Sequence, residues 1–132
     1  MGVWITDAQV WAFACVFIFM MCDILSGFLQ AVVNHNVQSV KIREGIVHKA
    51  SIALIIFAVY ALELTANHVA GLHIDGLGTV PVCVIVILME LVSIWENVCS
   101  ANPQLKNSPL GKLLESTVEM TGGDDHDRLF WW

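Results

Sequence analysis

Three long apolar stretches, separated by short polar segments, dominate the sequence. They cover about residues 10–33, 46–66 and 80–98. About 20 apolar residues in a helix cross the ~30 Å core of a bilayer, and backbone polar groups within lipid must be satisfied inside the segment. The pattern therefore predicts an all-α integral membrane protein with three transmembrane helices, forming a transmembrane domain over residues 1–101.

The second stretch is the shortest of the three. Its clean apolar run ends at Leu62, and a run of that length also fits a buried helix of a soluble protein. A helix that begins near Gly45, with the Lys49 side chain extended toward the membrane surface, reaches spanning length. Because apolar stretches of spanning length flank it on both sides, we interpret it as a span.

The ends of the predicted helices carry residues that favour turns. Residues 34–36 (NHN) close the first helix, and a glycine-rich stretch over residues 71–78 separates the second from the third. After the third helix, the pairs at 102–103 (NP) and 108–109 (SP) interrupt helical structure. A short amphipathic helix is expected over residues 110–120, within a tail that covers residues 102–132.

Composition agrees with a membrane protein and argues against several other classes. Hydrophobic residues make up 57% of the chain and charged residues 14%, and the mean hydropathy is +0.71. Soluble proteins average about 25% charged residues. The four cysteines have no metal-site or disulfide spacing, and no catalytic motif is present. We expect no enzyme activity, no metal, no cofactor and no nucleic-acid partner.

Basic residues near the spans predict the orientation in the membrane. Lys41, Arg43 and Lys49 lie in the first connection, whereas the second connection, residues 65–79, has no lysine or arginine. The tail carries basic residues and the segment before the first span has none. Three spans satisfy this distribution if the N-terminus lies outside and the C-terminus lies in the cytoplasm, with the three basic residues anchoring the inner surface.

Two acids, Asp23 and Glu90, interrupt their spans near the middle. An acid that faces lipid at the centre of a helix costs about 2.5–3.5 kcal/mol on insertion scales. With Lys49 at the membrane surface, no lysine or arginine lies in the central part of a span. We therefore expect no salt bridge to these acids within one chain, so they must be protonated, hydrogen-bonded or in contact with water.

Helical spacing surrounds each acid with small and polar residues, which membrane helices use to approach and bond one another. The two stripes can pack against each other inside one chain. Alternatively, they mediate contacts between chains or line water after assembly, which we favour because three helices have little interior for two carboxylates and several amides. The stripes consist of Asp23, Ser26, Gly27, Gln30, Ala31 and Asn34 on the first helix, and Glu90, Ser93 and Asn97 on the third.

The order of these segments resembles the phage holin family, which is also associated with release of clostridial toxins. The resemblance covers about residues 23–114 and includes residues 23–31 (DILSGFLQA), 45–49 (GIVHK) and 90–97 (ELVSIWEN). A proline-containing segment and a short amphipathic helix follow, as in that family. The chain departs from the family in its tail, which ends in Trp131 and Trp132, and in the polar second connection with His68 and His73.

The resemblance implies a function. Members of the family gather in the cytoplasmic membrane of the bacterial host, assemble with copies of themselves, and open lesions that collapse the proton gradient and release an endolysin or a toxin. In this interpretation Gly27 and Ala31 allow close approach of helices. The wettable faces would come from Asp23, Gln30, Glu90, Ser93 and Asn97.

Two other functions remain open at this point. A small ion or proton channel, or a transporter subunit, would use Asp23 or Glu90 as a carboxylate relay within the membrane. An antiholin or membrane-anchored regulator would bind a separate holin without damaging the membrane alone. Other clusters indicate less: the acidic residues 124–127 (DDHD) are more typical of a solvated tail than of a metal site.

Overall fold

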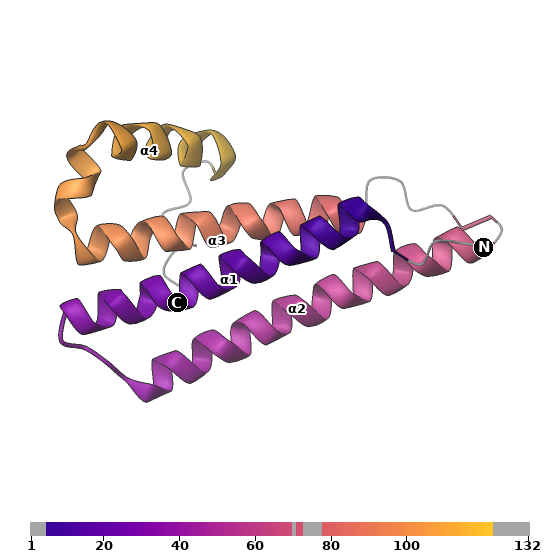
Figure 1. The fold of residues 1–132 in the computed structure, drawn as a ribbon, viewed down its shortest axis with the longest axis horizontal. Helices are drawn as coiled ribbons and strands as arrows, with labels where there is room; N and C mark the ends of the chain where they lie inside the picture. The colour runs from indigo at the N-terminus through magenta and orange to yellow at the C-terminus, as the bar shows by residue number, and fades with distance from the viewer. Residues whose placement is uncertain (1–4, 70, 73–77, 123–132) are drawn as a thin grey trace.

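The computed structural model describes residues 5–69, 71–72 and 78–122, and these residues form helices joined by short connections. The long helices are α1 (Asp7–Val33), α2 (Ser39–His68) and α3 (Thr79–Ala101), followed by the short η1 (Pro103–Asn107) and by α4 (Pro109–Gly122) (Figure 1). Within the described residues, α1, α2 and α3 are long and apolar enough to cross a membrane. The all-helical prediction with three spans and a short C-terminal helix is confirmed.

Local signals fix both ends of α1. Thr6 caps the N-terminus: its Oγ1 accepts a hydrogen bond from the Gln9 backbone N–H at 3.2 Å, and the Gln9 side chain accepts one from the Thr6 N–H at 2.9 Å. At the other end His35 takes a left-handed conformation, with φ of 53°. The Asn36 N–H then donates to the Ala31 carbonyl at 2.9 Å, which closes the helix as a Schellman turn where residues 34–36 were expected to end it.

The second helix begins earlier than its apolar run. α2 starts at Ser39 rather than near residue 46, and it continues to His68, a length of 30 residues. Such a helix is roughly 45 Å long, which exceeds the ~30 Å of a bilayer core. Lys49 therefore lies inside the helix, at its eleventh residue, instead of at its end.

The three long helices are attached to one another unequally. α1 and α3 run parallel and lie side by side, and they share the most extensive contact in the molecule (Figure 1). α2 runs antiparallel to both and contacts them sparsely. Its attachment includes an edge-to-face contact between the rings of Phe13 and Tyr60, whose centroids are 5.5 Å apart.

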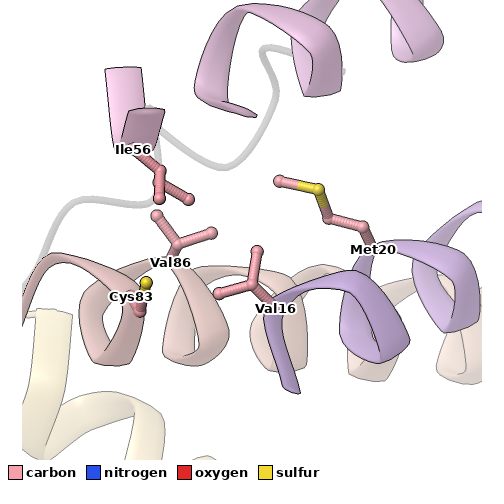
Figure 2. Close-up of a cluster of buried hydrophobic side chains, with 5 residues drawn as sticks. All are labelled: Val16, Met20, Ile56, Cys83 and Val86. Carbon is pink, nitrogen blue, oxygen red and sulfur yellow. The ribbon is translucent and has the colours of Figure 1, made fainter. Parts of the chain in front are cut away.

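A small apolar cluster lies where the three helices meet. It consists of Val16, Met20, Ile56, Cys83 and Val86 (Figure 2). Most large apolar side chains instead point outward: the exposed fraction is 72% for Trp11 and 67% for Phe57. In water such a surface is an aggregation or binding surface, but it is the surface that lipid requires around a transmembrane bundle.

A tight elbow connects α3 to α4. Gly111 is buried against η1, and a Cβ at this position would lie 2.3 Å from the Leu105 carbonyl oxygen. Glycine is therefore required for η1 and α4 to pack as they do. α4 covers the amphipathic segment predicted over residues 110–120. His73, residues 124–127 and the two C-terminal tryptophans lie outside the described residues.

Candidate functional site

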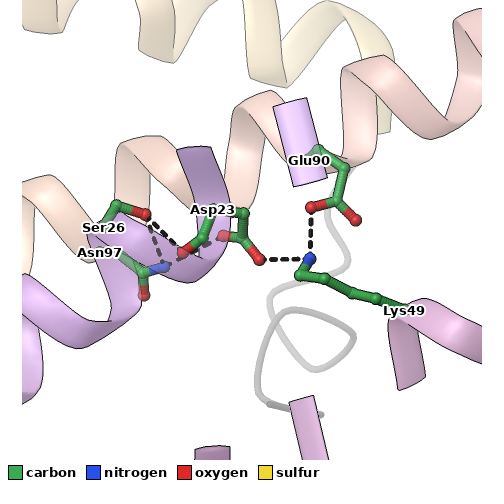
Figure 3. Close-up of polar contacts among 5 residues, drawn as sticks. All are labelled: Asp23, Ser26, Lys49, Glu90 and Asn97. Atoms are coloured by element: carbon green, nitrogen blue, oxygen red, sulfur yellow. Dashed lines mark hydrogen bonds and ion pairs between the residues drawn. The ribbon is translucent and has the colours of Figure 1, made fainter. Parts of the chain in front are cut away.

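A buried charge cluster joins the three long helices (Figure 3). The Lys49 ammonium on α2 lies 2.6 Å from Asp23 Oδ2 on α1 and 2.5 Å from Glu90 Oε2 on α3. The exposed fractions of these residues are 6% for Lys49, 5% for Asp23 and 1% for Glu90. One cation is thus shared by two carboxylates inside a single chain.

The three charged residues lie at a common depth in the bundle. Asp23 precedes the end of α1 by 10 residues, Lys49 follows the start of α2 by 10, and Glu90 precedes the end of α3 by 11. At 1.5 Å per residue each is roughly 15 Å from the same end of the bundle. That distance is about half of a ~30 Å bilayer core, so the cluster lies well inside the three helices and away from their ends.

The sequence around Lys49 explains how a lysine reaches this depth. Ile56 follows Lys49 by seven residues on α2, and Cys83 precedes Glu90 by seven on the antiparallel α3. Ile56 and Cys83 both belong to the apolar cluster. On both helices, therefore, about two helical turns separate the ion pair from the apolar cluster. The apolar packing of α2 against α3 thereby places the Lys49 side chain next to both acids.

Polar contacts between α1 and α3 extend the site. The Asn97 amide donates to Asp23 Oδ1 and to Ser26 Oγ, each at 3.1 Å, and the Ser26 hydroxyl donates to the Asp23 carbonyl at 2.9 Å (Figure 3). Gly27 lies beside the same amide: a Cβ there would be 3.5 Å from Asn97 Nδ2. The small residues let the two helices approach closely enough for these bonds.

Nearer the C-terminal ends of α1 and α3, one hydroxyl oxygen accepts hydrogen bonds from two side-chain amides. Gln30 and Asn34 both donate to Ser100 Oγ, each at 3.2 Å, and these groups are exposed. Among the described residues, every buried side-chain nitrogen or oxygen has a hydrogen-bond partner. The single chain therefore satisfies its own polar interior.

Charge pairing at this depth is costly to disturb. Removing one partner of a buried ion pair leaves an uncompensated charge, at a cost of about 3–5 kcal/mol. Between Lys49 and Lys106 the sequence contains no other lysine or arginine. In the described residues Lys49 is the cation that pairs with both acids, so moving α2 away from α1 and α3 would leave both carboxylates without it.

Comparison with known proteins decides the family. The model of the bacteriophage holin family matches residues 2–118. The chain belongs to the bacteriophage holin family. Holins of this family are non-enzymatic multi-pass membrane proteins that act with lysis machinery, so the predicted absence of enzyme activity is confirmed. No curated protein and no solved structure matches the chain.

Two expectations about the acids of this holin are wrong. A salt bridge to Asp23 and Glu90 does form within one chain, because α2 extends beyond its apolar run and carries Lys49 inward. The Lys49 side chain is accordingly buried between the helices rather than extended away from them. One chain also has enough interior to bury both carboxylates. Lys49 supplies within the chain the polar partner that neighbouring copies were expected to supply.

The remaining predicted site residues fall into two groups. The stripes on α1 and α3 pack against each other within one chain, with Ser93 6% exposed on α3 and Ala31 half-buried on α1. Lys41 and Arg43 are exposed in the first turns of α2, and their role as anchors stays a prediction. The lining of a pore by the stripe residues also stays a prediction.

A second polar contact, at the opposite end of the bundle, was not predicted. Glu63 on α2 accepts a hydrogen bond from the Thr79 N–H at 2.8 Å, a second from the Thr79 hydroxyl, and a third from the Gln9 side chain. The carboxylate thereby caps the N-terminus of α3, whose cap residue Gly78 supplies no side-chain bond. The only sequence signal was an acid near the end of an apolar run.

Proposed function

We propose that this holin assembles with copies of itself in the cytoplasmic membrane of a bacterial host and opens lesions there. The lesions collapse the proton gradient and let an endolysin reach the cell wall; a toxin would cross by the same route. The observation that carries the proposal is the charge cluster of Asp23, Lys49 and Glu90, enclosed by helices with an apolar outer surface.

Enclosed charges give this protein two ways to exist in a bilayer. As a single chain it presents apolar side chains to lipid and keeps the charge cluster of Asp23, Lys49 and Glu90 inside. When enough copies meet, the same groups face a water-filled lesion, because water solvates charges that lipid cannot. In that arrangement the wettable surface consists of Asp23, Ser26, Gln30, Glu90, Ser93 and Asn97, while Gly27 and Ala31 keep helices close.

The proposed topology follows the basic residues. We place the N-terminus outside, residues 1–101 in and at the membrane, and the tail over 102–132 in the cytoplasm. Lys41 and Arg43 then lie at the inner surface, where anionic lipid attracts them by about 1 kcal/mol each. This orientation puts the exposed amides of Gln30 and Asn34 at the cytoplasmic end.

Induced expression in a bacterium tests the function. With a co-expressed endolysin that lacks an export signal, we expect abrupt arrest of growth followed by lysis. With a catalytically inactive endolysin as the matched control, we expect the same arrest without lysis, because the membrane is open but the wall is intact.

Other outcomes identify the rival functions. A channel or transporter subunit would conduct small ions while the endolysin remained inside the cells. An antiholin would be harmless alone and would delay lysis by a second holin. Harmless expression in the presence of active endolysin would contradict the proposal.

A further inference from the structure

The proposed function requires the charged groups of the single chain to become accessible to water. We propose, resting on that function, that α2 is a removable cover over the α1–α3 pair, that Lys49 is its latch, and that α2 must leave before a lesion forms. The latch regulates the wettable surface: while Lys49 pairs with Asp23 and Glu90, these three charges are buried and cannot contact a second copy.

The attachment of α2 is suited to release. α1 and α3 are held together by an extensive contact that includes small residues, and by hydrogen bonds from the Asn97 amide to Asp23 and Ser26. α2 is instead held at separate points, where long side chains bridge the gap: Lys49 at mid-depth, Ile56 in the apolar cluster, Tyr60 against Phe13, and Glu63 at Thr79. Separating α2 therefore leaves the α1–α3 pair intact.

The charge cluster makes the release a two-state event. An ammonium withdrawn partway into lipid loses both carboxylates and gains no replacement, so partial opening in a lone chain is penalised by several kcal/mol. Full opening against water removes that penalty, because Asp23, Glu90 and Lys49 are then all hydrated. Water reaches this depth only where several copies have displaced lipid, so assembly comes first and opening of α2 follows.

Covalent attachment of α2 to α3 tests this order directly. Cys83 is a native cysteine that is fully buried in the apolar cluster to which Ile56 of α2 also belongs (Figure 2). In the full chain with Cys15, Cys22 and Cys99 changed to serine, Ile56→Cys supplies a second thiol. Oxidation with copper phenanthroline forms one disulfide between the thiols, with the two electrons passing to the oxidant and both protons released, and dithiothreitol reverses it.

The measurement is release of a fluorescent dextran from liposomes that contain the purified variant, in its oxidised and its reduced form. Labelling of free thiols with a maleimide polymer measures the fraction of chains that carry the disulfide, and crosslinking of surface amines measures assembly. The matched controls are the chain with Cys83 but Ile56 retained and the chain with Ile56→Cys and Cys83→Ser.

We expect the oxidised variant to assemble like the reduced one but to release dextran at least tenfold more slowly, with recovery after dithiothreitol and no change in either control. Equal release by the oxidised and reduced forms would overturn the cover. Failure of the disulfide to form would contradict the packing of α2 against α3 in the apolar cluster, from which the cover is argued. If the reduced variant and the wild type release no dextran, the proposed function itself fails and the cover fails with it.

Discussion

The contact between α1 and α3 and the contact that holds α2 use different kinds of side chain. Between α1 and α3, Gly27 and Ser26 bring the backbones close, and Asn97 bonds across a short gap. At α2, Lys49 and Glu63 reach across to charged or polar partners at separate points. One contact is continuous and the other is a set of discrete attachments.

These two kinds of contact allow one chain to be both stable and able to change conformation. Van der Waals contacts and hydrogen bonds that are distributed along a helix pair are lost only when the two helices separate along their whole length. A single ion pair is broken in one step, and the lost interaction energy is offset wherever water can hydrate the separated charges. The α1–α3 pair therefore behaves as a fixed unit, and α2 behaves as the part that moves.

The largest effect is expected from removing the latch. Lys49→Met leaves Asp23 and Glu90 buried without a cation, and we expect a loss of about 3–5 kcal/mol in the free energy of unfolding. Titration of the purified protein with dodecyl sulfate in mixed micelles measures this free energy. In cells the same variant should begin lysis earlier than the wild type.

Two further variants make the latch experiment specific. Lys41→Met, at an exposed position of the same helix, should change the free energy of unfolding by less than about 0.5 kcal/mol. The combination of Asp23→Asn, Lys49→Met and Glu90→Gln removes all three charges and should recover most of the loss, because an uncharged interior needs no counter-ion. Wild-type stability of Lys49→Met alone would show that the ion pair does not hold α2.

A smaller effect is expected from widening the α1–α3 contact. Gly27→Leu forces its side chain against Asn97, and overpacking of this kind costs about 1–3 kcal/mol. Gly27→Ala is the matched control, because a Cβ would make ordinary contact with Asn97 Nδ2 at 3.5 Å. The dodecyl sulfate titration measures both variants, and equal stability of the leucine and alanine variants would contradict close packing at this position.

Sequence predicted the fixed part of the molecule better than the moving part. The apolar runs placed the three spans, and helical spacing found the stripes of α1 and α3, because both depend on local periodicity. The pairing of Lys49 depends on where α2 begins, and Ser39 as its first residue is not marked by a capping side chain or by hydrophobicity. A lysine near the end of an apolar run usually extends to the surface, so its burial could not be inferred.

The same limit applied to Glu63. Its partners are the first turn of α3 and the Gln9 side chain, which are distant in sequence and meet it only after the three helices have packed. Capping by a residue on another helix leaves no local pattern, unlike the capping box of Thr6 and Gln9, which the spacing of those two residues can reveal.

Spin-label distances within one chain report whether α2 moves away from α1 when a lesion opens. In a cysteine-free background, labels replace the exposed Leu25 on α1 together with either Val47 on α2 or Met89 on α3, and labelled chains are diluted with unlabelled ones in liposomes. When dextran begins to pass, we predict that the Leu25–Val47 distance lengthens by about one helix diameter, ~10 Å, while the Leu25–Met89 distance is unchanged. Passage of dextran with the Leu25–Val47 distance unchanged, or with α1 and α3 moving apart, would show that α2 is not a removable cover.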